Sequence, residues 1–131
     1  MIRGTVTQVC TTIEQSNRLI SLGIDINTSD CHHWESEGKV YTYIGKYPEK
    51  DGQRLLEATP AWSLHRLYEM CPGCLFKLRP PLHRIVTGDG IFYCTDDFDV
   101  SLEVSFSQHC NLYDNIIDCI EWLRSINIEV G

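Results

Sequence analysis

The chain has 131 residues, enough for one domain to bury a hydrophobic core without the help of metals or disulfides. Hydrophobic residues make up 43% and charged residues 22% of it, and these values exclude a disordered chain and a fibre. The formal net charge of −7 argues against duplex DNA or RNA as a partner, because such binding depends on Lys and Arg side chains that neutralise phosphates. We expect a single domain over residues 1–131.

The first predicted element is a helix over residues 12–22. Thr11 and Glu14 form a capping-box pattern at its start, and Gly23 can end it in a left-handed conformation. We expect the apolar side of this helix to pack on the core. That side consists of Ile13, Leu19, Ile20 and Leu22.

A β-hairpin is predicted next. Residues 31–35 and 39–45 are rich in β-branched and aromatic side chains, and residues 36–38 form a short connection between them. Side chains of the second strand alternate between two partly apolar faces, so we expect one face to meet a helix and the other a partner or ligand. The faces carry Val40, Thr42 and Ile44 on one side and Tyr41 and Tyr43 on the other.

A central helix is predicted over residues 59–70. Thr59 is suited to accept a hydrogen bond from the first backbone N–H groups, and Pro60 is suited to the first helical position. Pro72 and Gly73 end this helix. Its buried stripe is expected to consist of Leu64, Leu67 and Cys71.

The second half of the chain predicts extended segments and a closing helix. The segments cover residues 75–79, 82–87, 91–95 and 102–107, with turns at 88–90 and 96–99. Pro80 and Pro81 must interrupt the first two, because proline cannot donate to a sheet ladder. The closing helix begins at Asn111, and its apolar face consists of Leu112, Ile116, Cys119, Ile120 and Leu123.

These elements together predict an α+β domain with the order α-β-β-α-β-β-β-α. Short turns between successive strands favour antiparallel pairing, so we expect a meandering sheet of about five strands covered by three helices. We expect the core to take up most of the cysteines and aromatic rings.

Seven cysteines are many for this length, but their number is odd and residues 1–5 lack the apolar stretch of a signal peptide. We therefore expect reduced thiols in a cytoplasmic protein. No apolar run approaches the roughly 20 residues that span a bilayer, so no membrane partner is expected.

Three short motifs carry a family resemblance. The chain has Thr-Ile-Glu-Gln-Ser at residues 12–16, Pro-Ala-Trp-Ser-Leu at 60–64 and Glu-Trp-Leu at 121–123. In these motifs it resembles a family of small uncharacterised proteins found in Bacteroidetes genomes and in their prophages and mobile elements. The resemblance covers nearly the whole chain, and its most specific part is the motif at 60–64.

The resemblance implies an accessory, often phage-borne, cytosolic protein, and it implies no activity, catalytic residue or cofactor. The chain departs from the family at residues 71–74, which read Cys-Pro-Gly-Cys where the family has an apolar-Pro-Lys helix ending. A metal site shared with the family is therefore not implied there.

Cys71 and Cys74 form the sharpest chemical motif, because two thiolates at this spacing can bind one tetrahedral zinc ion. Cys31 and His33 are candidates for the two further ligands, although they do not repeat the paired spacing. A dithiol redox pair is a second interpretation, but the motif follows a helix, where the helix dipole does not lower a thiol pKa. We favour ordinary cysteines here, with no cofactor, and keep zinc as the alternative.

A ligand site could be formed by basic and aromatic side chains. The local cluster of cations suits a phosphate or carboxylate, although an edge strand that uses charge to block aggregation would look the same. Aromatic side chains could line an apolar pocket or simply fill the core. The candidate ligand-binding residues are Lys77, Arg79, Arg84, Tyr41, Tyr43 and Trp62.

The sequence contains no Gly-rich phosphate loop, no Gly-x-Ser-x-Gly elbow and no His-Glu-x-x-His, so an enzyme is not supported. A nucleophile made of Cys31, Cys94 or Cys110 with a histidine is the enzymatic alternative. We predict a non-catalytic binding module of phage or mobile-element type that acts on a host protein or a small anionic metabolite, such as a nucleotide. A zinc-stabilised structural domain is the second hypothesis, and a homo-oligomer is left open.

Overall fold

The computed structural model describes residues 8–45, 49–50, 53–54, 58–95 and 103–131. Within these ranges the helices are α1 (Ile13–Ser21), the 3-10 helix η1 (Ile26–Thr28), α2 (Leu64–Met70) and α3 (Leu112–Ser125). The strands there are β1 (Cys31–Ser36), β2 (Lys39–Ile44), β3 (Glu49–Lys50), β4 (Gln53–Arg54), β5 (Ala58–Ala61), β6 (Cys74–Leu75), β7 (Leu82–Val86), β8 (Ile91–Cys94) and β9 (Val104–Phe106).

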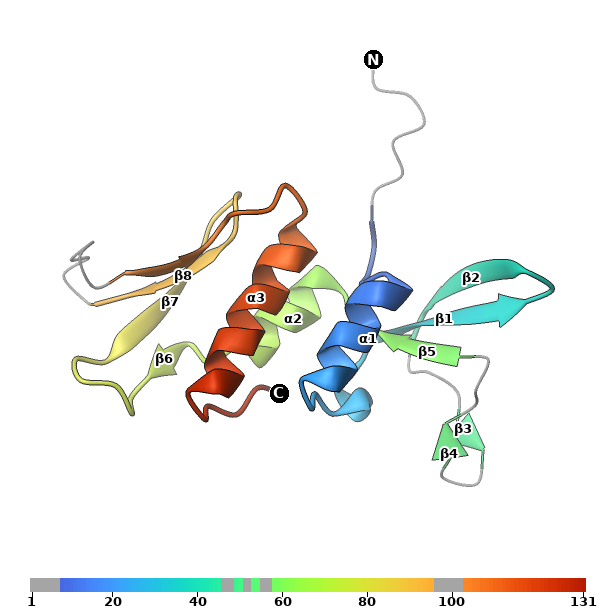
Figure 1. The fold of residues 1–131 in the computed structure, drawn as a ribbon, viewed down its shortest axis with the longest axis horizontal. Coiled ribbons are helices and arrows are strands. Elements are labelled where there is room, and N and C mark those ends of the chain that lie inside the picture. Colours follow the sequence, from blue (N-terminus) through green and yellow to red (C-terminus); the bar gives the residue numbers. More distant parts are fainter. Residues whose placement is uncertain (1–7, 46–48, 51–52, 55–57, 96–102) are drawn as a thin grey trace, which may run out of the picture.

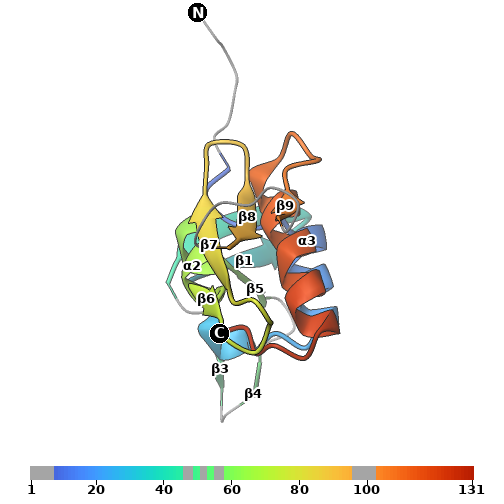
Figure 2. The same ribbon diagram turned by 90° about the vertical axis from the view of Figure 1, so that its left-hand side faces the viewer.

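The strands form two main antiparallel sheets. The first sheet has the order β2-β1-β5 and the second has the order β6-β7-β8-β9, while β3 and β4 pair only with each other. Figure 1 shows the helices between the two sheets. In the view of Figure 2 the second sheet lies in front of the helices and the first sheet behind them.

The predicted α+β class, the three helices and the antiparallel pairing of the strands are confirmed. The described strands do not form the one sheet of about five strands that we expected, but sheets of three and four strands and one separate pair. The division occurs at α2, because this helix follows β5 of the first sheet and precedes β6 of the second. The predicted turn at 96–99 and the start of the strand at residue 102 lie outside the described residues.

Helix α2 begins at Leu64, five residues later than the predicted start at 59. Ser63 is the actual N-cap, and its side-chain oxygen accepts a hydrogen bond from the Arg66 backbone N–H at 3.1 Å. Thr59 and Pro60 belong instead to β5, at the edge of the first sheet. An edge position tolerates proline, because no neighbouring strand on the open side needs its missing N–H.

The cap of α1 is also shifted by one residue. Thr12 and Gln15 form the capping box, not Thr11 and Glu14. Thr11 is fully buried, and its hydroxyl pairs with that of Ser16 at 2.7 Å. The prediction failed because both threonines fit the pattern, and only the tertiary structure requires one of them inside.

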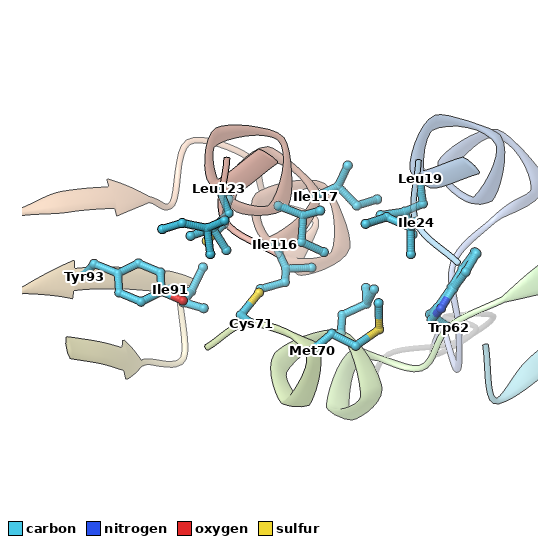
Figure 3. Packing of buried hydrophobic residues seen from close by; sticks show 14 of the residues in the cluster. Leu19, Ile24, Trp62, Met70, Cys71, Ile91, Tyr93, Ile116, Ile117 and Leu123 are labelled. Atoms are coloured by element: carbon cyan, nitrogen blue, oxygen red, sulfur yellow. The ribbon is translucent and has the colours of Figure 1, made fainter. Parts of the chain in front are cut away.

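The main hydrophobic core lies among the three helices and the second sheet (Figure 3). A smaller buried cluster at the first sheet consists of Cys10, Cys31 and Ala61. Most described cysteines are buried, as expected. The expectation for the aromatic rings is wrong, because only Trp62, Tyr93 and Tyr113 are buried among the described ones. The labelled residues of the main core are Leu19, Ile24, Trp62, Met70, Cys71, Ile91, Tyr93, Ile116, Ile117 and Leu123.

The β1–β2 hairpin extends away from this core (Figure 1). Every residue of β2 is exposed, whereas β5, at the other edge of the same sheet, is buried throughout. Strand β2 of the hairpin therefore exposes both apolar side chains and a strand edge to solvent.

Candidate functional site

Ring-bearing side chains gather on one face of the β1–β2 hairpin. The register pairs His32 with Tyr43 and Trp34 with Tyr41, and directly opposed residues share a face. The rings of His32 and Tyr43 stack, with centroids 5.2 Å apart and planes 21° apart. Tyr41 and Tyr43 are 45% and 48% exposed, and the other two are half-buried. We call the surface formed by His32, Trp34, Tyr41 and Tyr43 the aromatic face.

The turn of the hairpin sets this register. Glu37 and Gly38 have φ values of 51° and 75°, and two consecutive positive values are characteristic of a type I′ turn. This turn has the same twist as the strands that it joins, and it closes the pair formed by Ser36 and Lys39. The pairing of rings across the two strands follows from that closing pair.

The opposite face of the hairpin is covered only at β1. Cys31 and His33 are buried at 2% and 8% exposure, next to Cys10 of the N-terminal segment. On the same face of β2, Val40 is 52% exposed and Ile44 is 87% exposed. Strand β2 therefore has apolar side chains in solvent on both of its faces.

The outer edge of β2 has no partner strand among the residues that the structure describes. The Gly45 backbone N–H donates to the Asp30 carbonyl at 2.7 Å, which makes these two residues a hydrogen-bonded pair. Because such pairs alternate along an antiparallel ladder, Tyr41 and Tyr43 also bond to β1. The N–H and C=O groups of Val40, Thr42 and Ile44 consequently point outward, and we call this row the open edge.

The predicted cations lie near the second sheet, apart from the aromatic face. The Arg84 guanidinium donates to the carbonyl oxygens of Tyr68 at 2.6 Å and Cys71 at 2.7 Å, at the C-terminal end of α2. Arg79 donates to the carbonyl oxygens of Phe76 and Leu78 in its own loop. Both arginines thus hold the local backbone.

Trp62, another predicted ligand residue, is fully buried in the main core. Its indole N–H donates to the Thr28 hydroxyl at 2.9 Å. The structure therefore brings Tyr41 and Tyr43 together but places Trp62 away from the surface. It adds His32 to the two tyrosines, and the register of the hairpin could have indicated this residue.

The four candidate zinc ligands do not meet. Cys71 is buried in the main core, where the Cys119 thiol neighbours it, and Cys74 is half-exposed. Cys31 and His33 lie at the first sheet. Among the described residues, no group of three or more His, Cys, Asp or Glu side chains could hold a metal ion.

A thiol and an imidazole do meet at Cys10 and His33, with the sulfur 3.8 Å from Nε2. Burial and the neighbouring Cys31 raise the pKa of the Cys10 thiol to about 12, so the thiol stays protonated. Nε2 also lies 2.6 Å from the Thr11 carbonyl oxygen, which can only accept, so Nε2 carries the proton. This arrangement opposes a thiolate nucleophile and its base. The sequence did not indicate Cys10, because no motif surrounds it.

Three hollows in the described surface are lined by residues outside the hairpin. One hollow of about 450 Å³ lies beside β6 and has Cys74, Phe76, Lys77 and Glu129 among its lining residues, but no histidine. A second, of about 710 Å³, is lined by side chains of both charges, including Arg124. A third, of about 360 Å³, has Ser105, Asp118 and Glu121 among its lining residues.

No helix in the described part of the chain has both the length and the apolar character needed to cross a membrane. Comparisons with models of protein families, with curated proteins and with solved structures found no significant match. Function must therefore be argued from the geometry of the chain itself.

Proposed function

We propose that the chain is a non-catalytic binding module, an accessory protein of phage or mobile-element type that acts on a host protein. The partner binds on the aromatic face of the β1–β2 hairpin. The observation that carries this proposal is the pairing of half-exposed rings on a hairpin that extends from the core. Cytoplasmic action accords with the free, buried thiols of Cys10, Cys31 and Cys119.

The composition of the aromatic face supports a protein partner. Tyrosine and tryptophan are enriched at protein interfaces and supply much of their binding energy, because they bury a large area at a small cost in side-chain entropy. Tyr41 and Tyr43 leave nearly half of their surface exposed. Tyr41 and Tyr43 lie on the same face of β2, and each is paired with a ring of β1, so the exposed rings form one continuous patch.

A protein is favoured over an anionic nucleotide. A nucleotide site would need cations next to the stacking rings, but Arg79 and Arg84 bond to backbone carbonyls near the second sheet. The net charge of −7 also disfavours a polyanion. Removing Arg84 would weaken the end of α2 whether or not a nucleotide binds. A substitution of Lys77 is therefore the better test of nucleotide binding.

Selection from a random peptide library tests the proposal. Peptides selected on the wild-type protein should bind Tyr41→Ala at least about tenfold more weakly, as expected for an exposed aromatic anchor. Phe76→Ala is the matched control, because Phe76 is a 72% exposed aromatic residue near the second sheet. It should bind the same peptides as the wild type does.

Two results would contradict the proposal. Selected peptides that bind Tyr41→Ala as tightly as the wild type but lose their affinity for Phe76→Ala would place the site near the second sheet. Detectable turnover of nucleotide or ester substrates, abolished by one Cys or His substitution, would instead make the protein an enzyme.

A further inference from the structure

Among the described residues, the open edge of β2 shows none of the devices that normally protect a strand edge. Such devices are proline, a bulge, several charged side chains, or a covering helix or loop. The register of β1 with β2 is continuous over all six pairs, so β2 contains no bulge. Its sequence has no proline, and its one charge, Lys39, stands at the end next to the turn. The unpaired N–H and C=O groups of such an edge can pair with another strand.

The residue types of β2 are symmetric about Thr42. Reading outward in either direction gives a tyrosine and then a β-branched aliphatic residue, as the order Val40-Tyr41-Thr42-Tyr43-Ile44 shows. An antiparallel pair of identical strands is related by a two-fold axis, so one strand meets the same residues in reverse. A palindromic strand therefore complements a second copy of itself.

The direction of the backbone groups restricts the register of such a pair. Residues whose N–H and C=O point outward must face outward-pointing residues of the other strand, which excludes every register that pairs an even-numbered with an odd-numbered position. A two-fold axis at Thr42 satisfies this condition. It also lets all residues from Lys39 to Gly45 find an opposite residue, more than any other allowed axis.

In this register the cross-strand pairs from Val40 to Ile44 each belong to a favourable class. Thr42 faces Thr42 of the second copy, and Val40 faces Ile44 of the second copy, both as hydrogen-bonded pairs. Tyr41 faces Tyr43 of the second copy as a non-hydrogen-bonded pair, in which side chains approach most closely. The hydrogen-bond pattern and the side-chain pairing thus select the same register.

We propose that β2 pairs with β2 of a second copy across a two-fold axis at Thr42. The three strands of each first sheet then form one continuous antiparallel sheet of six strands, with the two β5 strands at its edges. The aromatic faces of the two copies adjoin across the axis. This dimer rests on strand geometry and not on the identity of a host partner.

Sedimentation equilibrium at rising protein concentration tests the dimer and its register. The wild-type mass should rise from 15.1 kDa towards twice that value. Val40→Lys and Ile44→Glu should each raise the dissociation constant about tenfold, because each replaces two aliphatic cross-strand pairs per dimer with a charge that faces an apolar side chain. The double variant should regain most of the affinity, since each introduced ammonium then faces an introduced carboxylate. Both sites are more than half exposed, so the monomer fold should tolerate these changes, which circular dichroism can check.

Val86→Lys is the control, because Val86 is a 43% exposed strand residue of the second sheet and should not affect the mass. A wild-type protein that stays monomeric at every concentration would overturn the proposal, and so would a dimer weakened equally by the control. A double variant no tighter than the single variants would overturn the register.

Discussion

Thr11 joins segments that are distant in the sequence. Its backbone N–H donates to the Trp62 carbonyl at 2.9 Å, and its hydroxyl accepts from the Trp62 N–H at 3.1 Å. The same hydroxyl pairs with Ser16, and its carbonyl lies 2.6 Å from His33 Nε2. Because all these atoms are removed from water, each needs its partner. Thr11 therefore fixes the N-terminal segment to α1, β1 and the start of α2.

We expect Thr11→Val to lower the free energy of unfolding by about 1–3 kcal/mol. The substitution keeps the shape of the side chain but leaves the Trp62 N–H and the Ser16 hydroxyl with one partner fewer. Urea denaturation measures the change. The exposed Thr87→Val variant should change the value by less than about 0.5 kcal/mol, and a buried variant no worse than this control would contradict the role of Thr11.

The thiols should differ in reactivity. Cys110 is exposed, whereas Cys10 is 3% exposed and has a pKa raised by burial to about 12, so it has almost no thiolate near pH 8. Iodoacetamide should therefore modify Cys110 rapidly and Cys10 only after unfolding. Peptide mass spectrometry over time can follow both residues. Fast modification of Cys10 in the folded protein would mean that it is a reactive nucleophile after all.

At the scale of elements, local patterns predicted the hairpin well but other boundaries poorly. The segment predicted as extended over 75–79 is a strand only at Cys74–Leu75, because a turn follows, and β5 lies where the start of the central helix was predicted. The alternation of side chains in β2 and the turn before it were sufficient to predict the hairpin, because both are local. The start of α2 could not be predicted from local patterns, since Thr59 suits the N-cap position as well as Ser63 does. Ser63 prevails because Asp30, distant in sequence, accepts hydrogen bonds from its N–H at 2.8 Å and its hydroxyl at 2.5 Å.

Ser63→Ala should therefore destabilise the fold by about 1–2 kcal/mol through the loss of the cap. The loss of the hydroxyl that bonds to Asp30 acts in the same direction. Thr59→Val is the matched comparison, because the sequence alone would assign the cap to Thr59. Thr59→Val should leave the free energy of unfolding, measured by heat or urea, nearly unchanged. The reverse ranking of these two variants would place the helix start at 59.

At the scale of the whole molecule, the helices lie between the two sheets, and the main core joins them to the second sheet. The main cluster runs from Leu19 and Trp62 to Tyr93 in β8 (Figure 3). Sequence patterns predicted several of its helical members, such as Leu67 and Ile116, but not the division of the strands, because pairing partners are set by contacts between distant segments. The same limit applies to the site, where each ring was visible in the sequence but their common face was not.

Because Trp62 directly follows β5 and belongs to the main core, we expect the two sheets to unfold in a single transition. Trp34 reports on the first sheet, and the rings of Tyr93 and Phe106 contact Trp122, which therefore reports on the second. Single-tryptophan variants that retain either residue should give coincident urea transitions. Two separated midpoints would show that the sheets unfold independently and that the core does not couple them.

Amide hydrogen exchange in β2 tests the open edge most directly. At low protein concentration the N–H groups of Tyr41 and Tyr43, bonded to β1, should exchange slowly, and those of Val40, Thr42 and Ile44 should exchange rapidly. Raising the concentration should slow the second set as copies pair. Equal protection of all five amides in the dilute protein would contradict an exposed strand edge and, with it, the hairpin as the binding surface.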